Sequence, residues 1–216
     1  AMAPPATHPP VRPPFRADHV GRLLRPASLA QAREKFTRGE LAAPALRELE
    51  DAAVREVVAR QQSIGLASIT DGEFRRDWWH LDFLVLLDGA APTENPGPKF
   101  KIAGQSEQPP IVSVTGRIGC SRPIMADHFA FLKSVVSQGT AKMTIPSPSM
   151  LHLRGGRASI SKTVYPDLAQ FWADTAAAYR VAIRHLADAG CTYLQLDDIT
   201  FAYLCDPKIQ ENCRAN

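Results

Sequence analysis

The sequence predicts an α/β fold, and two observations carry this prediction. Short apolar runs alternate along the chain with helical patterns; they cover about residues 16–20, 66–70, 111–115, 141–145 and 191–196. Several of these runs pass directly into polar segments, at 71–73, 146–149 and 197–198. Alternating strands and helices are typical of α/β proteins, whose functional side chains follow the carboxyl ends of parallel strands.

The first half of the chain is predicted to contain a tail and two helices. Residues 1–14 hold six prolines, which favours an extended, disordered tail before a domain spanning 15–216. Ser28 and Gln31 form an S-x-x-Q pattern that predicts the start of a short helix, closed by Gly39. A longer helix follows, because apolar residues recur at helical spacing and a glycine, Gly65, stands where the helix ends; these residues are Leu46, Leu49, Ala53, Val57 and Ile64.

The second half is predicted to hold a long loop and two further helices. Residues 89–110 are rich in proline, glycine and charge and are interpreted as a loop. Phe129, Leu132, Val135 and Val136 indicate one helix. The clearest helical pattern runs from 168 to 189, and Gly190 ends it before the last predicted strand.

Composition and charge exclude several classes of protein. The chain has 216 residues with 45% hydrophobic and 22% charged residues, which is ordinary for one globular domain. The net charge is +3 and the basic residues are scattered, so we expect no nucleic-acid partner. No apolar run reaches the roughly 20 residues of a membrane span, and no export signal is apparent. The four cysteines form no C-x-x-C pair, so we expect reduced thiols and a cytoplasmic location.

Four motifs at predicted strands carry a family resemblance. They are the segments 15–26, 70–76 (Thr-Asp-Gly-Glu-Phe-Arg-Arg), 144–151 (Thr-Ile-Pro-Ser-Pro-Ser-Met-Leu) and 193–198 with 202–207 after it. Together they resemble the cobalamin-independent methionine synthases, above all the short single-barrel branch of 5-methyltetrahydropteroyltriglutamate–homocysteine methyltransferases. The resemblance implies a (β/α)8 TIM-type barrel, of which this chain holds only about the first five strands. An incomplete barrel leaves two open sheet edges.

The same resemblance implies an activity and a metal. The family transfers a methyl group from a folate to a thiol such as homocysteine in methionine biosynthesis, with zinc holding the thiolate. Its zinc ligands, a His-x-Cys pair, a Glu and a later Cys, lie on strands beyond the one that ends at Asp198. No histidine follows His185, and Cys213 comes too soon after Pro207 to be a zinc cysteine, so we expect it on a helix. The expectation is therefore a chain with no metal ligands of its own that is inactive by itself.

Two acidic positions are the leading candidates for substrate binding. The resemblance implies that Glu73 binds the amino group of the amino-acid substrate, through a charge-assisted hydrogen bond; the alternative is a surface ion pair with Arg75 or Arg76. Asp197 is the candidate catalytic residue and, with Asp198, a substrate contact. The family has Asp-Glu here, and the alternative for the shorter Asp198 is a cap on the next segment.

Further candidates lie at other strand ends. His19, Gly21 and Arg22 belong to the first predicted strand, where the family usually has Gly-Ser against the substrate carboxylate. Arg22 replaces that serine and could clamp a carboxylate or fill the pocket. Ser147 is a candidate hydrogen-bonding residue, and Trp78 is a candidate to stack on the folate's pterin ring.

Two other functions stay open at this point. One is a non-catalytic fragment whose open sheet is completed by self-association. The other is a relative with a different thiol substrate, similar to the coenzyme M transferases, and the replacement of serine by Arg22 keeps this alternative open.

Overall fold

The computed structural model describes residues 12–13, 15, 18–95, 100–102, 105–107 and 110–215. The predicted tail at 1–14 lies, apart from residues 12 and 13, outside the described residues. The helices of the described part, 3-10 turns included, are α1 Ala27–Thr37, α2 Ala43–Ser63, α3 Leu81–Leu84, α4 Ala126–Val135, η1 Pro148–Leu151, η2 Gly156–Ser159, α5 Leu168–Asp188, α6 Thr200–Tyr203 and α7 Pro207–Ala215. The strands are β1 Ser68–Ile69, β2 Asp88–Thr93, β3 Phe100–Ile102, β4 Gln105–Glu107, β5 Ile111–Gly119, β6 Thr140–Ala141, β7 Met143–Pro146 and β8 Leu194–Asp197.

Parallel strands confirm the predicted α/β class. β1 pairs in parallel with β6, and β7 pairs in parallel with β8. β6 and β7 are one extended stretch interrupted at Lys142, whose backbone N–H still donates to the Ile69 carbonyl at 2.8 Å. Three segments far apart in the sequence therefore lie side by side, and their carboxyl ends face one edge. The described residues form two-stranded sheets and no closed barrel.

The predicted loop at 89–110 was wrong, because the segment contains strands. β2 pairs antiparallel with β5, and β3 pairs antiparallel with β4. Gly89 has φ +75° at a register shift, and a Cβ there would lie 2.5 Å from the Arg117 carbonyl oxygen, so glycine permits the close approach of the two strands.

The count of five barrel strands is corrected as well. β5, predicted as a barrel strand at 111–115, is antiparallel to β2, and its other pairing among the described residues is an isolated bridge from Val114 to Ile160, which lies in none of the parallel strands. Residues 18–20, the described part of the first predicted strand, are irregular.

The first two helices form where predicted, with different details. α1 begins at Ala27 without a side-chain cap, so Ser28 lies inside the helix and not at its N-cap. On α2, Leu49 and Ile64 are 47% and 68% exposed, so the predicted apolar stripe is wrong at these positions. The buried face is instead formed by Leu46, Glu50, Val54, Val58 and Gln61.

Polar residues explain the shifted face of α2. Gln61 exchanges hydrogen bonds with the backbone of Thr70, donating to its carbonyl at 2.8 Å and accepting from its N–H at 3.0 Å. Glu50 pairs with Arg33 of α1. Buried polar groups with partners can occupy a core-facing position, and a search for apolar spacing misses them.

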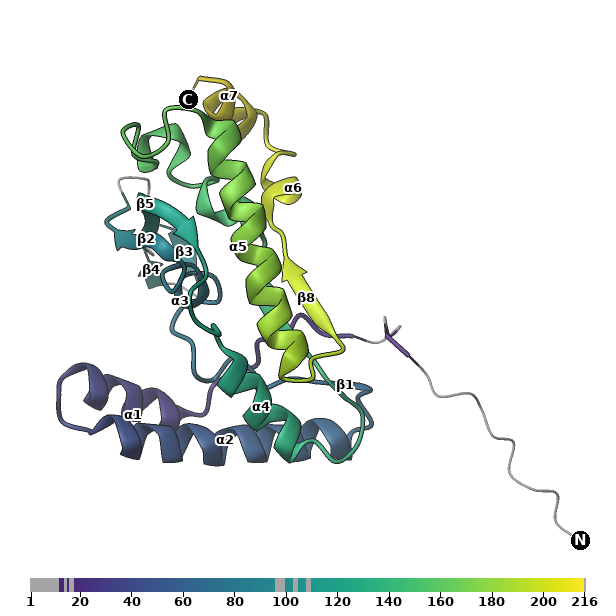
Figure 1. Ribbon diagram of the computed structural model, residues 1–216. Helices are drawn as coiled ribbons and strands as arrows, with labels where there is room; N and C mark the ends of the chain where they lie inside the picture. Colours follow the sequence, from purple (N-terminus) through teal and green to yellow (C-terminus); the bar gives the residue numbers. More distant parts are fainter. Residues whose placement is uncertain are drawn as a thin grey trace, which may run out of the picture.

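The later helices confirm their predictions. Phe129 and Leu132 of α4 are buried, and so are Phe171, Tyr179 and Leu186 of α5. Gly190 has φ +91° just after α5. Figure 1 shows α5 running beside β8, with α1 and α2 at one end of the molecule and α6 and α7 at the other.

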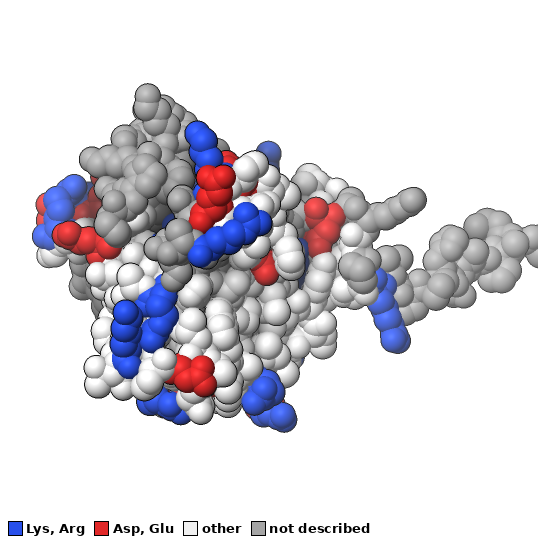
Figure 2. Space-filling model, turned by 90° about the horizontal axis from the view of Figure 1, so that it is seen from above, with Lys and Arg blue, Asp and Glu red and all other residues white. Residues whose placement is uncertain are grey.

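The face of the molecule seen in Figure 2 shows no strong charge bias. On the face in Figure 2, Lys and Arg alternate with Asp and Glu among uncharged residues. Within the described part of the chain, no helix combines the length and the apolarity needed to cross a membrane.

Candidate functional site

A cavity of about 430 Å³, which we call the mouth, opens where β1 and β8 end. It is lined by Val20, Arg22, Glu73, Trp79, Gln195, Leu196, Asp197, Asp198 and Ile199. The fold therefore brings together four of the predicted site residues, Arg22, Glu73, Asp197 and Asp198, from three separate segments of the chain. Its volume falls in the range of small-molecule sites.

Glu73 carries the most distinctive chemistry in this cavity. It has φ +58°, a left-handed conformation that is unusual for a residue with a side chain, and its N–H donates to Asp71 Oδ1 at 2.9 Å. Its Oε1 accepts a hydrogen bond from the Thr144 hydroxyl at 3.1 Å, whereas its Oε2 is buried without a partner. Burial raises the pKa of the Glu73 carboxyl, and Arg76 only partly opposes this effect. An unsatisfied buried carboxylate oxygen is ready to receive a cationic hydrogen-bond donor.

Arg76 does not form the surface ion pair considered as the alternative for Glu73. Its guanidinium lies 3.9 Å from Glu73 Oε1, and both side chains are almost fully buried. The shorter contact of Arg76 is to the Thr144 carbonyl at 2.6 Å, so its main role is to join the turn after β1 to β7. Arg75 instead pairs with Asp51 at 2.6 Å.

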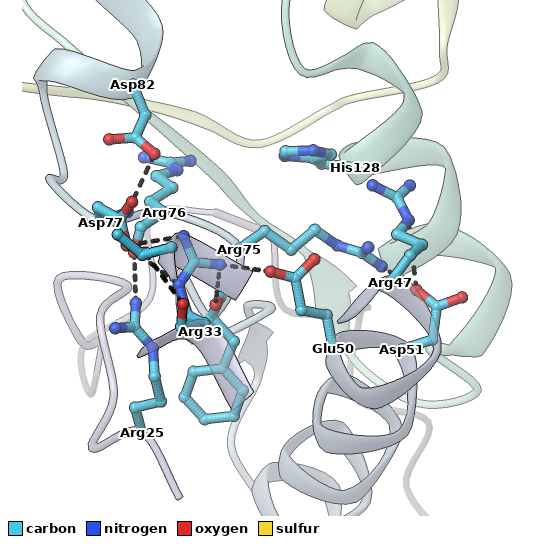
Figure 3. A network of polar contacts seen from close by, with 12 residues as sticks. Arg25, Arg33, Arg47, Glu50, Asp51, Arg75, Arg76, Asp77, Asp82 and His128 are labelled. Carbon is cyan, nitrogen blue, oxygen red and sulfur yellow. Dashed lines mark hydrogen bonds and ion pairs between the residues drawn. The ribbon is translucent and has the colours of Figure 1, made fainter. Parts of the chain in front are cut away.

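A network of arginines holds the turn that carries Glu73. Arg25 donates to the Arg76 carbonyl, and Arg33 binds Glu50 and, at 2.7 Å, Asp77. Figure 3 shows Arg25 and Arg33 converging on Arg76 and Asp77, which follow Glu73 in the chain. This support keeps Glu73 in its left-handed conformation.

Gly21 fits closely against the same carboxylate. Its φ is +137°, and an added Cβ would lie 2.7 Å from Thr144 Cγ2 and 3.5 Å from Glu73 Oε1. The Thr70 hydroxyl donates to the Gly21 carbonyl at 2.7 Å and fixes this approach. Only glycine lets the first segment pass so near to Glu73.

Arg22 and Asp197 both line this cavity. Arg22 is exposed and makes no hydrogen bond or ion pair with any described residue, so it offers a free cation. Asp197 accepts a hydrogen bond from Gln195 at 2.5 Å, and burial raises the pKa of its carboxyl. The cavity thus presents one cation and two carboxylates whose pKa values are raised.

Asp198 and Ser147 are already engaged within the chain. Asp198 accepts a hydrogen bond from the Thr200 N–H at 2.8 Å, which is the capping contact considered as its alternative. The Ser147 hydroxyl lies 2.6 Å from that of Ser149 and does not line the cavity.

His19 and Trp78 lie outside the cavity. The Nε2 of His19 lies 3.3 Å from the carbonyl oxygen of Ser68 in β1. Trp78 lines a different cavity, and its neighbour Trp79 lines this one. Pterin stacking by Trp78 stays a prediction.

Sequence reasoning missed a buried cluster below the cavity. The Lys142 ammonium binds Asp18 at 3.0 Å and the His19 carbonyl at 2.6 Å, and its side chain is fully buried. Burial disfavours charge on Asp18, but hydrogen bonds from Ser68, Tyr193 and Lys142 outweigh it and lower the pKa of this carboxyl to about 2. A lone lysine in an apolar run was the only sequence signal.

The described residues do not fit the zinc that the resemblance implies. No group of three or more His, Cys, Asp or Glu side chains in the described part of the chain is placed to hold a metal ion. Zinc in proteins needs three or four such donors. No step is therefore assigned to zinc here. Cys213 lies within α7, as expected.

Comparison with known proteins identifies the family. The sequence model of a protein family, the cobalamin-independent synthase catalytic domain, matches residues 20–208. This chain belongs to the cobalamin-independent methionine synthase family. Within this family, a structure from Listeria monocytogenes described as a vitamin-B12-independent methionine synthase is 41% identical, with a TM-score of 0.75; the match covers 94% of this chain and 59% of that one.

Other members of the family show how much of a relative the chain represents. The uncharacterized protein YxjH of Bacillus subtilis is 42% identical over 94% of this chain and 52% of its own length. The methionine synthase of Sulfolobus acidocaldarius is 28% identical over 83% of this chain and 50% of its own length. The chain thus spans about half the length of these curated relatives.

Proposed function

We propose that this chain forms the amino-acid-binding part of a methyltransferase site, which transfers a methyl group from a folate to a thiol such as homocysteine. The observation that carries the proposal is the buried, unpartnered Oε2 of Glu73 in a cavity that also holds the free Arg22. Homocysteine carries an ammonium and a carboxylate on one carbon. Glu73 binds the ammonium and Arg22 binds the carboxylate, each through a charge-assisted hydrogen bond.

The remaining residues of the cavity complete this arrangement. Asp197 supplies a second carboxylate beside Glu73 and is the proposed catalytic group, as a proton acceptor whose raised pKa suits that task. Val20, Leu196 and Ile199 give the cavity an apolar wall, and Trp79 offers a flat face to the folate. Asp198 contributes by capping α6 and so fixing the chain after Asp197.

Zinc binding and methyl transfer are proposed to need residues outside this chain. No His-x-Cys pair follows His185, and the described donors form no metal site. We expect the 216-residue chain to bind the amino acid without transferring a methyl group. One tightly held zinc per chain in a metal assay would contradict this.

Calorimetric titration with three thiols tests the proposal. Homocysteine has both charged groups, 4-mercaptobutyrate lacks the ammonium, and 3-mercaptopropylamine lacks the carboxylate. Glu73→Gln should weaken homocysteine binding by about ten- to hundredfold and leave 4-mercaptobutyrate unchanged, because a hydrogen bond between charged groups contributes about 1.5–3 kcal/mol. Arg22→Gln should weaken homocysteine and 4-mercaptobutyrate but not the amine.

A matched control and a contrary result complete the test. Glu48→Gln removes an exposed carboxylate of α2 that is far from the cavity lining and should change none of the affinities. If Glu73→Gln weakened the affinity for all three thiols equally, Glu73 would support the fold and would not bind the ammonium.

The free Arg22 also favours a second candidate, a thiol that carries a sulfonate, as coenzyme M does. A guanidinium binds a sulfonate as readily as a carboxylate, and such a thiol has no ammonium for Glu73. If 2-mercaptoethanesulfonate bound more tightly than homocysteine, and Glu73→Gln left that binding unchanged, this candidate would replace the first.

The open edge of β8 supports a proposal about assembly. Among the described strands, β8 pairs only with β7, and large apolar side chains are exposed on it and next to it: Leu196 at 45%, Val20 at 67% and Phe201 at 77%. We propose that further (β/α) units, or a second copy of the chain, cover this edge. Light scattering should show self-association of the isolated chain, and Phe201→Glu should weaken it; a stable monomer would contradict the proposal.

A further inference from the structure

A second cavity, of about 440 Å³, lies apart from the mouth and shares no lining residue with it. It is formed by the turn after β1, by α3, by Pro92 of β2 and by the start of α4. Its apolar walls are Trp78, Leu81, Val85, Leu86, Pro92 and Met125. Trp78 and Trp79 are adjacent in sequence, yet each lines a different cavity.

Arg75 is the buried cation of this second cavity. Its side chain is 1% exposed, and its Nη2 donates to Asp51 at 2.6 Å. Its Nε and Nη1 are buried and have no hydrogen-bond partner. Figure 3 shows the Arg75 side chain extending toward Arg47 and Asp51, with the His128 ring above it in this view. Buried guanidinium donors without acceptors are unfavourable unless an acceptor arrives.

The acidic residues that line this second cavity, Asp77 and Asp82, already accept hydrogen bonds from other groups of the chain. Asp77 accepts hydrogen bonds from Arg33 at 2.7 and 3.0 Å. Asp82 accepts from the backbone N–H groups of Asp77 and Trp78, at 3.0 and 2.9 Å. Neither carboxylate contacts Arg75, so its free donors still need an acceptor from outside the chain.

The start of α4 points to the same kind of ligand. Met125 and His128, from the first turn of this ten-residue helix, line the cavity, and no side chain caps the helix. Met125 has φ +56°, a strained conformation of the kind that accumulates at binding sites. The positive end of a helix dipole attracts anions, and the carboxylate of Asp127 in the same turn is already bound to Arg47 at 3.1 Å.

We propose that this second cavity binds a small carboxylic acid with an aromatic or branched apolar body. The body packs against Trp78 and the other apolar walls, and the carboxylate accepts hydrogen bonds from Arg75. His128, whose Nδ1 is also buried without a partner, lies beside it. This site is separate from the amino-acid site of the mouth and does not depend on the function proposed for it.

The test uses 4-phenylbutyrate as the probe and 4-phenylbutanamide as its uncharged match. Tryptophan fluorescence reports binding, because the two adjacent tryptophans line different cavities. The acid should bind saturably, about tenfold more tightly than the amide. Its fluorescence signal should persist in Trp79→Phe and disappear in Trp78→Phe.

Two variants separate the role of Arg75 from a general effect on packing. The Arg55 and Arg75 guanidinium groups lie over the Phe131 ring, at 5.0 and 4.7 Å from its centroid, but only Arg75 lines the cavity. Arg75→Met should remove the preference for the acid, and Arg55→Met should keep it. Val85→Phe fills the cavity and should abolish binding of both probes without touching Arg75.

Three outcomes would overturn the proposal. They are the absence of saturable binding, equal affinity for acid and amide in the wild-type chain, and equal effects of Arg75→Met and Arg55→Met. The comparison of acid with amide needs no variant, so it decides the matter even if Arg75→Met fails to fold. Binding that Glu73→Gln weakens would place the probe in the mouth and also overturn the assignment.

Discussion

The Thr144 hydroxyl donates a hydrogen bond to Glu73 Oε1 at 3.1 Å and so joins β7 to the turn after β1. The same threonine accepts the buried guanidinium of Arg76 through its carbonyl at 2.6 Å. One residue of β7 therefore holds both the carboxylate that lines the mouth and the cation behind it. The first prediction follows from this contact.

Thr144→Val should shift the pH dependence of ligand binding. The hydroxyl lowers the pKa of Glu73, against the larger effect of burial, which raises it. Loss of the hydroxyl should raise the pKa of Glu73 further. Because only the ionised carboxylate binds the ammonium in this way, homocysteine affinity should decrease at a higher pH in the variant than in the wild type as the solution is acidified. Titrations from pH 8 to pH 4 measure this, and Thr144→Ser, which keeps the hydroxyl, is the control. If the homocysteine affinity of Thr144→Val decreased over the same pH range as that of the wild type, the role of this hydrogen bond would be contradicted.

Gly21→Ala should destabilise the fold more than Gly39→Ala does. Both glycines have a positive φ, but nothing lies within 4 Å of a Cβ at Gly39, whereas at Gly21 it meets Thr144 Cγ2 at 2.7 Å. We expect a loss of about 1 kcal/mol at Gly39 from backbone strain alone and roughly 3 kcal/mol at Gly21 from strain and overlap. Urea unfolding measures both.

A double variant identifies the overlapping atom. Thr144→Ser removes Cγ2 and keeps the hydroxyl, so it should recover part of the stability lost in Gly21→Ala. If it recovers none, the loss comes from the backbone and not from the contact with Thr144.

Asp18→Asn should destabilise the chain at neutral pH and have little effect near pH 2. The Asp18 carboxyl has a pKa of about 2 in the folded chain, below its usual 3.8. A lowered carboxyl pKa stabilises the fold above pH 4, and this contribution is lost as the pH falls toward 2. Removing one partner of the buried pair with Lys142 should cost about 3 kcal/mol at pH 7. Unfolding midpoints of both proteins at several pH values should converge on acidification; a constant gap would contradict the pairing.

His80 should make the fold less stable as the pH falls from about 6.5 to 4. Burial, with a smaller effect of Arg154, lowers the pKa of this imidazole to about 4. In the unfolded chain this imidazole is protonated below about pH 6.5, whereas in the folded chain it is protonated only below about pH 4. The free energy of unfolding is therefore unaffected above pH 6.5 and decreases as the pH falls from 6.5 to 4. The loss is of the order of 3 kcal/mol. His80→Gln should flatten the stability profile between these pH values, and an unchanged profile would assign the effect to other histidines.

Local pattern in the sequence determined most of the elements. The apolar spacing of α5, with Gly190 after it, and the runs that became β7 and β8 needed no knowledge of the rest of the chain. Polar residues after the runs at 66–70 and 191–196 also pointed to Glu73 and Asp197, and the family resemblance pointed to Arg22; the structure gathers all three around one cavity. These features are encoded within a few neighbouring residues, so a single sequence displays them.

Only the tertiary structure decided which partners these residues meet. The antiparallel pairing of β2 with β5 joins a segment whose composition resembles a loop to a predicted strand, and Gln61 and Glu50 face the core because distant groups satisfy them. The burial of Lys142 against Asp18, and the separation of Trp78 from Trp79 into two cavities, likewise depend on contacts between remote segments. The free energy of burying a polar group depends on its partner, and the partner's position is a property of the folded chain.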